Sequence, residues 1–167
     1  NHGNQPCLHN AWLFNYSGKP WLTQKWTRAI CNDFYGTEPL HGYGYGQDED
    51  QGQLGAWYVM ASIGLFDVQG HTASRPTFQL GSPLFDKITI DLNSEYYSAD
   101  KLEIIVENNE NNHPYVQSAT IGGHALDKPW FYRDELIQSG ELRIIMGPEP
   151  NDNWENSSPP PSMSSMN

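Results

Sequence analysis

The chain has 167 residues and a formal net charge of −11, from 9 basic and 20 acidic side chains, which argues against nucleic acids and anionic membranes as partners. This length suits one domain with or without a small appendage, and six Trp, nine Tyr and six Phe supply a core and argue against disorder. No stretch of about 18 apolar residues is present, so the sequence predicts no membrane span.

The first part of the chain has the apolar spacing of helices. We expect a short helix over residues 6–16, then one from Pro20, which suits a first helical turn, to Gly36, which suits an end. Its apolar residues recur every four positions and predict a single buried stripe, formed by Leu22, Trp26, Ile30 and Phe34. A third helix is predicted over residues 53–63. Because it is apolar on nearly every side, we expect it to be buried all round.

From about residue 76 the apolar period changes to two, which predicts strands with one face on a core. The segments with this pattern are 87–92, 102–107 and 141–146, with shorter strands expected at 77–80, 117–121 and 130–131. No helical crossover separates neighbouring segments, so we expect mostly antiparallel pairing.

These elements predict an α+β fold class. We expect helices over residues 1–75 and a β-region over 76–150. Residues 151–167 contain three consecutive prolines, five Ser and few apolar side chains, which indicates a disordered tail.

Three adjacent acids, Asp48, Glu49 and Asp50, lie in a glycine-rich loop directly before the third predicted helix. One interpretation is helix capping, since a carboxylate near a helix N-terminus gains about 0.3–1 kcal/mol. The other is metal binding or acid–base chemistry, because three neighbouring carboxylates repel one another and a cation would relieve that. An EF-hand loop is excluded, since Val59 stands where its bidentate Glu is required.

The N-terminal segment carries a second group of polar side chains. Asn4 and Gln5 offer amide oxygens, which are good ligands for hard cations, and His9 can bond a sugar hydroxyl. The alternative is a polar loop in which Asn4 caps a helix. Together with the acids, these residues suggest an oxygen-rich cation site built from two loops. Cys7 and Cys31 are too few for a disulfide scaffold, and we expect both to be buried thiols.

Five blocks of this sequence resemble glycoside hydrolase family 92, whose members are calcium-dependent, exo-acting, inverting α-mannosidases. The resemblance extends to about residue 153 and is carried by residues 2–6, 13–21, 47–59, 80–86 and 117–120. It implies a fragment of a larger enzyme, in which the helices end an (α/α)6 barrel and pack on a missing N-terminal part. We therefore expect a signal upstream of Asn1 and a secreted, periplasmic or cell-surface protein.

The resemblance also implies roles for single residues. Asp48 and Asp50 would be catalytic as the base, Asn4, Gln5 and Asp50 would lie at a Ca²⁺ ion, and His9 and Glu49 would contact a mannose-containing glycan, which we expect to be α-1,2-linked. The general acid would lie upstream, so the isolated fragment should be inactive. Cys7-Leu8 stands where the family often has Ser-His, which puts sugar contacts there in doubt. The alternative function is a non-catalytic structural or carbohydrate-binding module.

Overall fold

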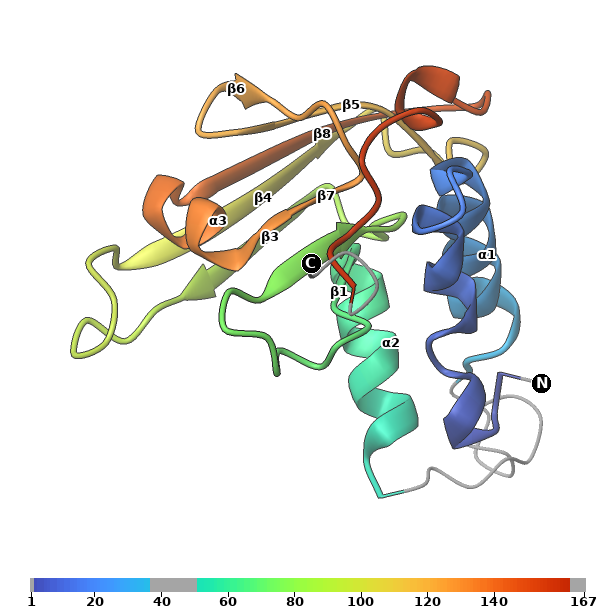
Figure 1. Ribbon diagram of the computed structural model, residues 1–167, viewed down its shortest axis with the longest axis horizontal. Helices are drawn as coiled ribbons and strands as arrows, with labels where there is room; N and C mark the ends of the chain where they lie inside the picture. The colour runs from blue at the N-terminus through green and yellow to red at the C-terminus, as the bar shows by residue number, and fades with distance from the viewer. Residues whose placement is uncertain (1, 37–50, 163–167) are drawn as a thin grey trace.

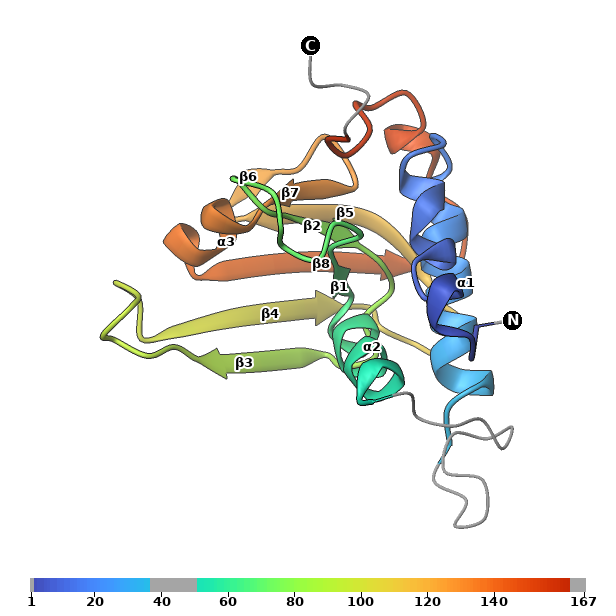
Figure 2. The ribbon, with the colours of Figure 1, turned by 60° about the horizontal axis from the view of Figure 1, so that its bottom comes forward.

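The computed structural model describes residues 2–36 and 51–162. The helices of the first part stand beside two β-sheets, so the predicted α+β class is confirmed (Figure 1). A view turned by 60° shows the helices at one end of the strands of the larger sheet (Figure 2). No helix in the described part of the chain is both long and apolar enough to cross a membrane.

The N-terminal segment forms two short 3₁₀ helices, η1 (Gln5–Cys7) and η2 (Asn10–Asn15), and the prediction of one helix over residues 6–16 is wrong. The backbone makes bonds three residues apart, such as Cys7 N–H to the Asn4 carbonyl at 2.7 Å. Runs of this geometry are short because their hydrogen bonds are poorly aligned. Between the two 3₁₀ helices, the Leu8 carbonyl accepts a hydrogen bond from the indole N–H of Trp57 at 2.8 Å. In a continuous helix this carbonyl would accept a backbone N–H instead.

Helix α1 (Pro20–Asp33) begins at the predicted proline, but the predicted stripe is not its buried face. Trp26 is 45% exposed and the rest of the stripe is only half-buried. The buried residues of α1 are largely polar, and they are Pro20, Thr23, Gln24, Thr27, Arg28 and Cys31. The spacing rule located the helix, which ends at Asp33 rather than near Gly36. It did not give the orientation of the helix, because hydrogen bonds rather than apolar contacts dock α1 on the β-region.

Helix α2 (Gln53–Ile63) has the predicted bounds, but it is not buried all round. Leu54, Trp57 and Ala61 are buried, whereas Val59 is 56% exposed. Among the described residues nothing covers the Val59 face. The helix ends at Gly64 in the left-handed conformation (φ 84°), where an added Cβ would come within 2.8 Å of the Pro83 ring.

The β-region contains a small and a large sheet. The small sheet is antiparallel in the order β1-β2-β7, formed by Leu65–Phe66, Thr77–Leu80 and Trp130–Tyr132. The large sheet has the order β3-β4-β8-β5-β6, formed by Lys87–Asp91, Lys101–Glu107, Glu141–Gly147, Tyr115–Ile121 and His124–Ala125.

The predicted antiparallel pairing holds for every strand pair of the described sheets except β4 with β8, which are parallel. Between β4 and β8 in the chain lie β5, β6, β7 and the short helix α3 (Arg133–Ser139), a helix that the sequence pattern does not predict. This long connection brings β8 back beside β4 in the same direction. Parallel neighbours need such a crossover.

The main core lies on the face of the large sheet that meets the small sheet and α3. Strands β4 and β8 bury alternate residues there, as their period of two predicts. The fully buried side chains of this cluster include Leu80, Ile104, Phe131, Leu142 and Ile144. Strand β3 departs from the prediction, since Ile90 is 38% exposed and Ile88 only half-buried. It lies at the edge of the large sheet, and of its residues only Ile88 packs against the main core.

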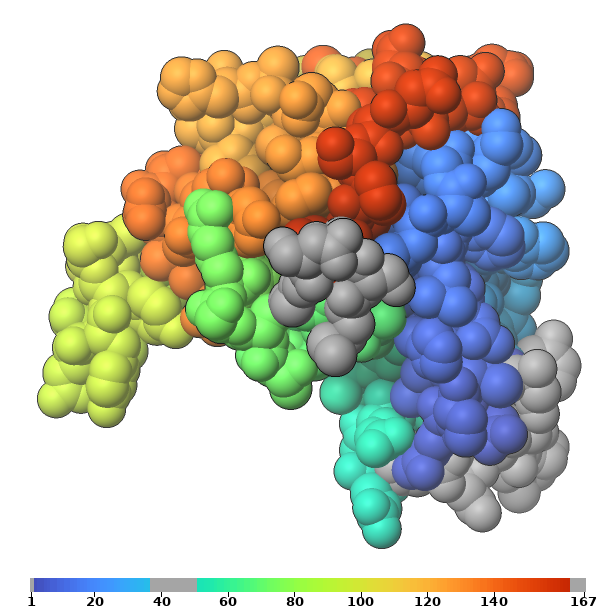
Figure 3. All heavy atoms as spheres, in the orientation of Figure 1, coloured from blue at the N-terminus to red at the C-terminus, as the bar shows by residue number. Residues whose placement is uncertain are grey.

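The prediction of a disordered tail is wrong for residues 151–162, whereas 163–167 lie outside the described residues. Trp154, in the turn η3 (Asp152–Trp154), is 5% exposed and belongs to the main core. The Ser158 carbonyl accepts the indole N–H of Trp130 at 2.8 Å, and Glu155 pairs with Lys19 of the helical part. Figure 3 shows this segment, in red, lying across the junction of the two parts. Its apolar anchor and its backbone hydrogen bonds outweigh the polar composition.

Arg28 fastens α1 to the β-region. Its Nε donates to Ser82 Oγ at 3.0 Å, and Nη2 donates to the Pro83 carbonyl at 2.6 Å and to Asn109 Oδ1 at 2.7 Å. One turn earlier, Gln24 Oε1 accepts the backbone N–H of Val116 at 2.9 Å. Arg28 is only 6% exposed, and burial lowers the pKa of its guanidinium group. None of the three acceptors of Arg28 is a carboxylate. A buried cation held by neutral acceptors makes this contact sensitive to substitution.

We expect Arg28→Ala to lower the free energy of unfolding of the protein that contains this chain by about 2–4 kcal/mol, because buried acceptors left without a donor cost about 1–3 kcal/mol each. Lys25→Ala, on the exposed side of the same helix, is the control and should change it by less than about 0.5 kcal/mol. Denaturant titration of both variants measures this. Equal losses would show that the Arg28 contacts contribute no more than an exposed side chain.

Candidate functional site

The predicted ligands Asn4 and Gln5 stand at the start of η1, and both are exposed. Asn4 occupies the N-cap position, yet its side chain makes no capping hydrogen bond, so the capping interpretation of Asn4 is wrong. His9 is half-buried and precedes η2. The turn thus presents two amide side chains at the surface, while its backbone is braced by the bond from Cys7 N–H to the Asn4 carbonyl.

The predicted acids Asp48, Glu49 and Asp50 lie outside the described residues. The expectation that they form one cation site with Asn4 and Gln5 therefore stays a prediction. The N-cap of α2 is Gly52, in the left-handed conformation at φ 87°, and no residue of the first turn of α2 is acidic.

A cluster of rings joins the N-terminal segment to α2 and to the residues that follow α1. His2 Nε2 and Tyr35 Oη share a hydrogen bond of 2.8 Å, and the ring centroids of His2 and Trp57 are 4.2 Å apart at an interplanar angle of 61°. Tyr35 and Trp57 stack with an angle of 10° between rings, and Tyr58 packs on Tyr35 at 4.8 Å. Burial lowers the pKa of His2 to about 4, so the imidazole is uncharged near neutral pH.

Local sequence patterns do not reveal this cluster. His2 lies in a polar segment, whereas Trp57 and Tyr58 lie in an apolar helix. Their sequence separations, 33 between His2 and Tyr35 and 49 between Leu8 and Trp57, leave no local pattern to detect. The only signal was the density of aromatic residues in the chain.

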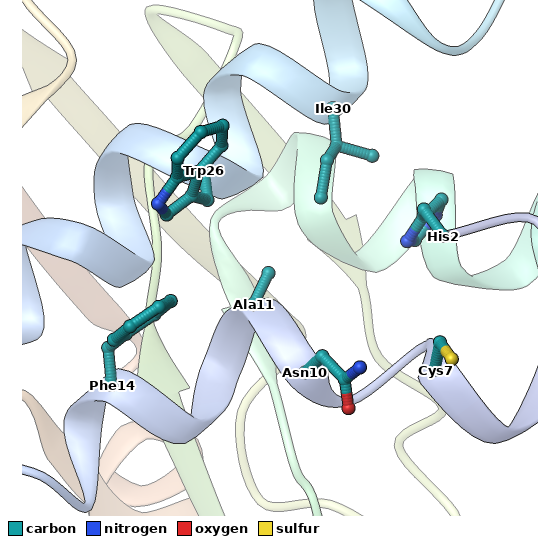
Figure 4. Close-up of a pocket in the computed structure, with 7 residues that line it drawn as sticks. All are labelled: His2, Cys7, Asn10, Ala11, Phe14, Trp26 and Ile30. Atoms are coloured by element: carbon teal, nitrogen blue, oxygen red, sulfur yellow. The ribbon is translucent and has the colours of Figure 1, made fainter.

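A cavity of about 370 Å³ lies between the N-terminal segment and the outer side of α1. In Figure 4 the α1 side chains Trp26 and Ile30 face a row from η2 and η1, with His2 and Cys7 at one end and Phe14 at the other. The remaining lining residues are Asn10 and Ala11. Most of the lining is apolar, so the cavity suits a hydrophobic side chain better than a sugar.

A larger hollow of about 670 Å³ is lined by residues of the β5–β6 hairpin and of α3. Figure 1 shows these elements on the opposite side of the molecule from the N-terminus. The rim of this hollow carries the charged groups of Asp127, Lys128 and Glu135, with His124 beside them. It contains none of the residues predicted for the site.

The described residues fit a cation site only in part. No group of three or more His, Cys, Asp or Glu side chains in residues 2–36 and 51–162 could hold a metal. Asn4 and Gln5 supply oxygen donors of the kind that Ca²⁺ accepts. Carboxylates would be needed to complete such a site, and the acids predicted to supply them are not among the described residues.

The two cysteines are both free thiols. Cys31 is buried as expected, whereas Cys7 is only half-buried, so that expectation is wrong for Cys7. Burial raises the pKa of the Cys31 thiol to about 12. The thiolate is the reactive form, so Cys31 does not act as a nucleophile near neutral pH.

This chain is similar in sequence and in fold to known proteins. A model of the glycosyl hydrolase family 92 catalytic domain matches residues 1–148. A family GH92 α-mannosidase from Bacteroides thetaiotaomicron superposes with a TM-score of 0.82 at 32% identity, over 97% of this chain and 21% of its own. The same mannosidase is also known in complex with mannoimidazole. A family GH92 inverting mannosidase from Bacteroides thetaiotaomicron VPI-5482 superposes with a TM-score of 0.78 at 34% identity, over 93% of this chain and 20% of its own.

A protein of Arthroderma benhamiae, named an uncharacterized secreted glycosidase, is 25% identical over 147 residues, which is 88% of this chain and 18% of that protein. The chain therefore spans about a fifth of the length of the relatives that it matches.

We expect Cys31 to stay unmodified when the native protein is treated with iodoacetamide at pH 8, and to react once the protein is unfolded. The reason is that burial both raises its pKa and blocks access. Peptide mass spectrometry distinguishes Cys31 from Cys7. Complete alkylation of Cys31 in the folded protein within minutes would contradict this prediction.

Proposed function

Because this chain belongs to glycosyl hydrolase family 92, we propose that it supplies part of the active site of a calcium-dependent, inverting exo-α-mannosidase. The substrate would be a glycan, such as an N-glycan, with terminal α-linked mannose, and α-1,2-linked mannose is the first to test. The observation that carries the proposal is the match of the catalytic-domain model to residues 1–148, together with the likeness to solved α-mannosidases.

An inverting glycosidase needs two carboxyl groups, about 6.5–9.5 Å apart, on opposite faces of the scissile bond. We assign the base to Asp48 and Asp50, which would take a proton from the attacking water. Adjacent acids of one loop cannot provide the required separation, so the general acid that protonates the leaving oxygen would come from elsewhere in the polypeptide. Glu49 and His9 would contact the sugar.

Calcium would be held by the amide oxygens of Asn4 and Gln5 together with Asp50. When bound, the ion would supply positive charge that keeps the neighbouring carboxylates ionised, as a base requires, and would contact sugar hydroxyls. The exposed amides at the start of η1 support this assignment. A neutral glycan also suits a chain of net charge −11, which would repel an anionic substrate.

The rest of the polypeptide would cover the apolar surface that this chain leaves exposed. Trp26 on α1 and Val59 on α2 are 45% and 56% exposed. The relatives are about five times as long as this chain, so they contain enough sequence for further helices to pack on this surface. The name of the Arthroderma relative supports secretion of the whole protein. A non-catalytic module is the less favoured alternative, because the matching model is that of a catalytic domain.

In the complete enzyme we expect Asp48→Asn and Asp50→Asn each to reduce kcat by about 10²–10⁴-fold, the range that general acid–base catalysis contributes. We expect Glu49→Gln to reduce kcat much less, because in an extended segment alternate side chains face the same side, and Glu49 would then face away from Asp48 and Asp50. The measurement is turnover of an aryl α-mannoside at saturating calcium, with folding checked by thermal melts. Small and equal effects at all three positions would leave the acids only a structural role.

We expect the isolated chain of 167 residues to show no mannosidase activity. It would lack the general acid and the part of the polypeptide that positions the sugar. The loss of rate from these two absences would exceed the rate enhancement that the base alone provides. An assay with an aryl α-mannoside and calcium tests this. Turnover by the isolated chain that disappears in Asp50→Asn would contradict the assignment of the general acid to another segment.

A further inference from the structure

One indole holds both ends of the turn that presents Asn4 and Gln5. On one side, the Trp57 ring packs against the ring of His2, with centroids 4.2 Å apart. On the other side, the Trp57 Nε1–H donates to the Leu8 carbonyl at 2.8 Å. His2 and Leu8 thus bracket the two amide residues, and both attachments converge on one side chain of α2.

The anchor is itself fixed. Trp57 is 2% exposed and stacks on Tyr35, with ring centroids 5.8 Å apart. Tyr35, just beyond the end of α1, also bonds His2 through its hydroxyl at 2.8 Å. The turn is therefore attached both to α2 and to the segment that follows α1, while Asn4 and Gln5 remain exposed at its surface.

We propose that Trp57 is a positioning residue, which holds the turn from His2 to Leu8 so that Asn4 and Gln5 are oriented for ligand binding; the ligand, calcium with a mannose unit, rests on the proposed function. A flexible turn would have to be ordered on each binding event, and a buried anchor removes that entropy loss beforehand. Partners that orient metal ligands in this way are worth about 10–100-fold in metal affinity or activity.

The decisive variant is Trp57→Phe in the complete enzyme. Phenylalanine keeps an aromatic ring against His2 and Tyr35 but removes the N–H that bonds the Leu8 carbonyl. Trp130→Phe is the matched control, because the Trp130 indole also donates to a backbone carbonyl at 2.8 Å, that of Ser158, and is 5% exposed. Both variants lose one buried hydrogen bond of the same kind, so the thermal midpoint should fall by a similar amount in each.

Two measurements separate positioning from stability. Hydrogen exchange followed by mass spectrometry should show faster exchange of residues 2–8 in Trp57→Phe and no change there in Trp130→Phe. Calcium titration of the metal-free enzyme by calorimetry should show a Kd raised about tenfold in Trp57→Phe only. Equal exchange of residues 2–8 in the two variants would overturn the anchoring. Faster exchange with an unchanged Kd and an unchanged KM for an aryl α-mannoside would overturn the positioning role.

A failure of the proposed function gives a different result. If the wild-type enzyme binds no calcium, the calcium assignment fails, and the change in KM decides the positioning role instead. If Trp57→Phe does not fold, Tyr35→Phe replaces it, since it removes only the hydroxyl that bonds His2. Its control is Tyr16→Phe, whose hydroxyl accepts a bond from Gln79 Nε2 at 3.1 Å. A smaller rise in Kd is then expected in Tyr35→Phe alone, and equal values in both variants would overturn the proposal.

Discussion

The arrangement of the molecule depends on how one buried guanidinium is satisfied. Arg28 finds its acceptors on Ser82, Pro83 and Asn109, all in the β-region and all neutral. A buried cation without such partners would be strongly destabilising, so the geometry of these bonds determines which side of α1 faces the sheet. With Gln24 bonded to the Val116 amide on the same face, the helix is held in one orientation on the β-region.

This orientation turns the apolar stripe of α1 away from the β-region. Two residues of this stripe, Trp26 and Ile30, line the cavity beside the N-terminal segment. The exposed face of α2 at Val59 has the same character. Both helices therefore leave large apolar side chains exposed, as surfaces that meet a partner do. The chain spans only about a fifth of the length of its relatives.

The β-region acts as a scaffold for the helical part, and residues 151–162 strengthen the connection through Trp154 and Glu155. At the opposite end of the helices, Trp57 and Tyr35 fix the N-terminal turn. The amide side chains that we assign to ligand binding are thus attached, through buried contacts, to elements that are themselves anchored. A site of this kind gains precision because its main supporting group, Trp57, lies in a packed helix rather than in a loop.

The sequence by itself determined the features that depend on near neighbours in the chain. The α+β class, the start of α1 at Pro20, both bounds of α2 and the alternating burial of β4 and β8 follow from local periodicity, and the family follows from short motifs. Tertiary structure decided the rest. The outward stripe of α1, the parallel pairing of β4 with β8, the ordered segment around Trp154 and the anchoring of the N-terminal turn by Trp57 all depend on contacts between distant residues. A periodic pattern shows that a helix has an apolar side, but it cannot show which partner that side meets, because the partner is chosen by hydrogen bonds and packing that form only when the chain is folded.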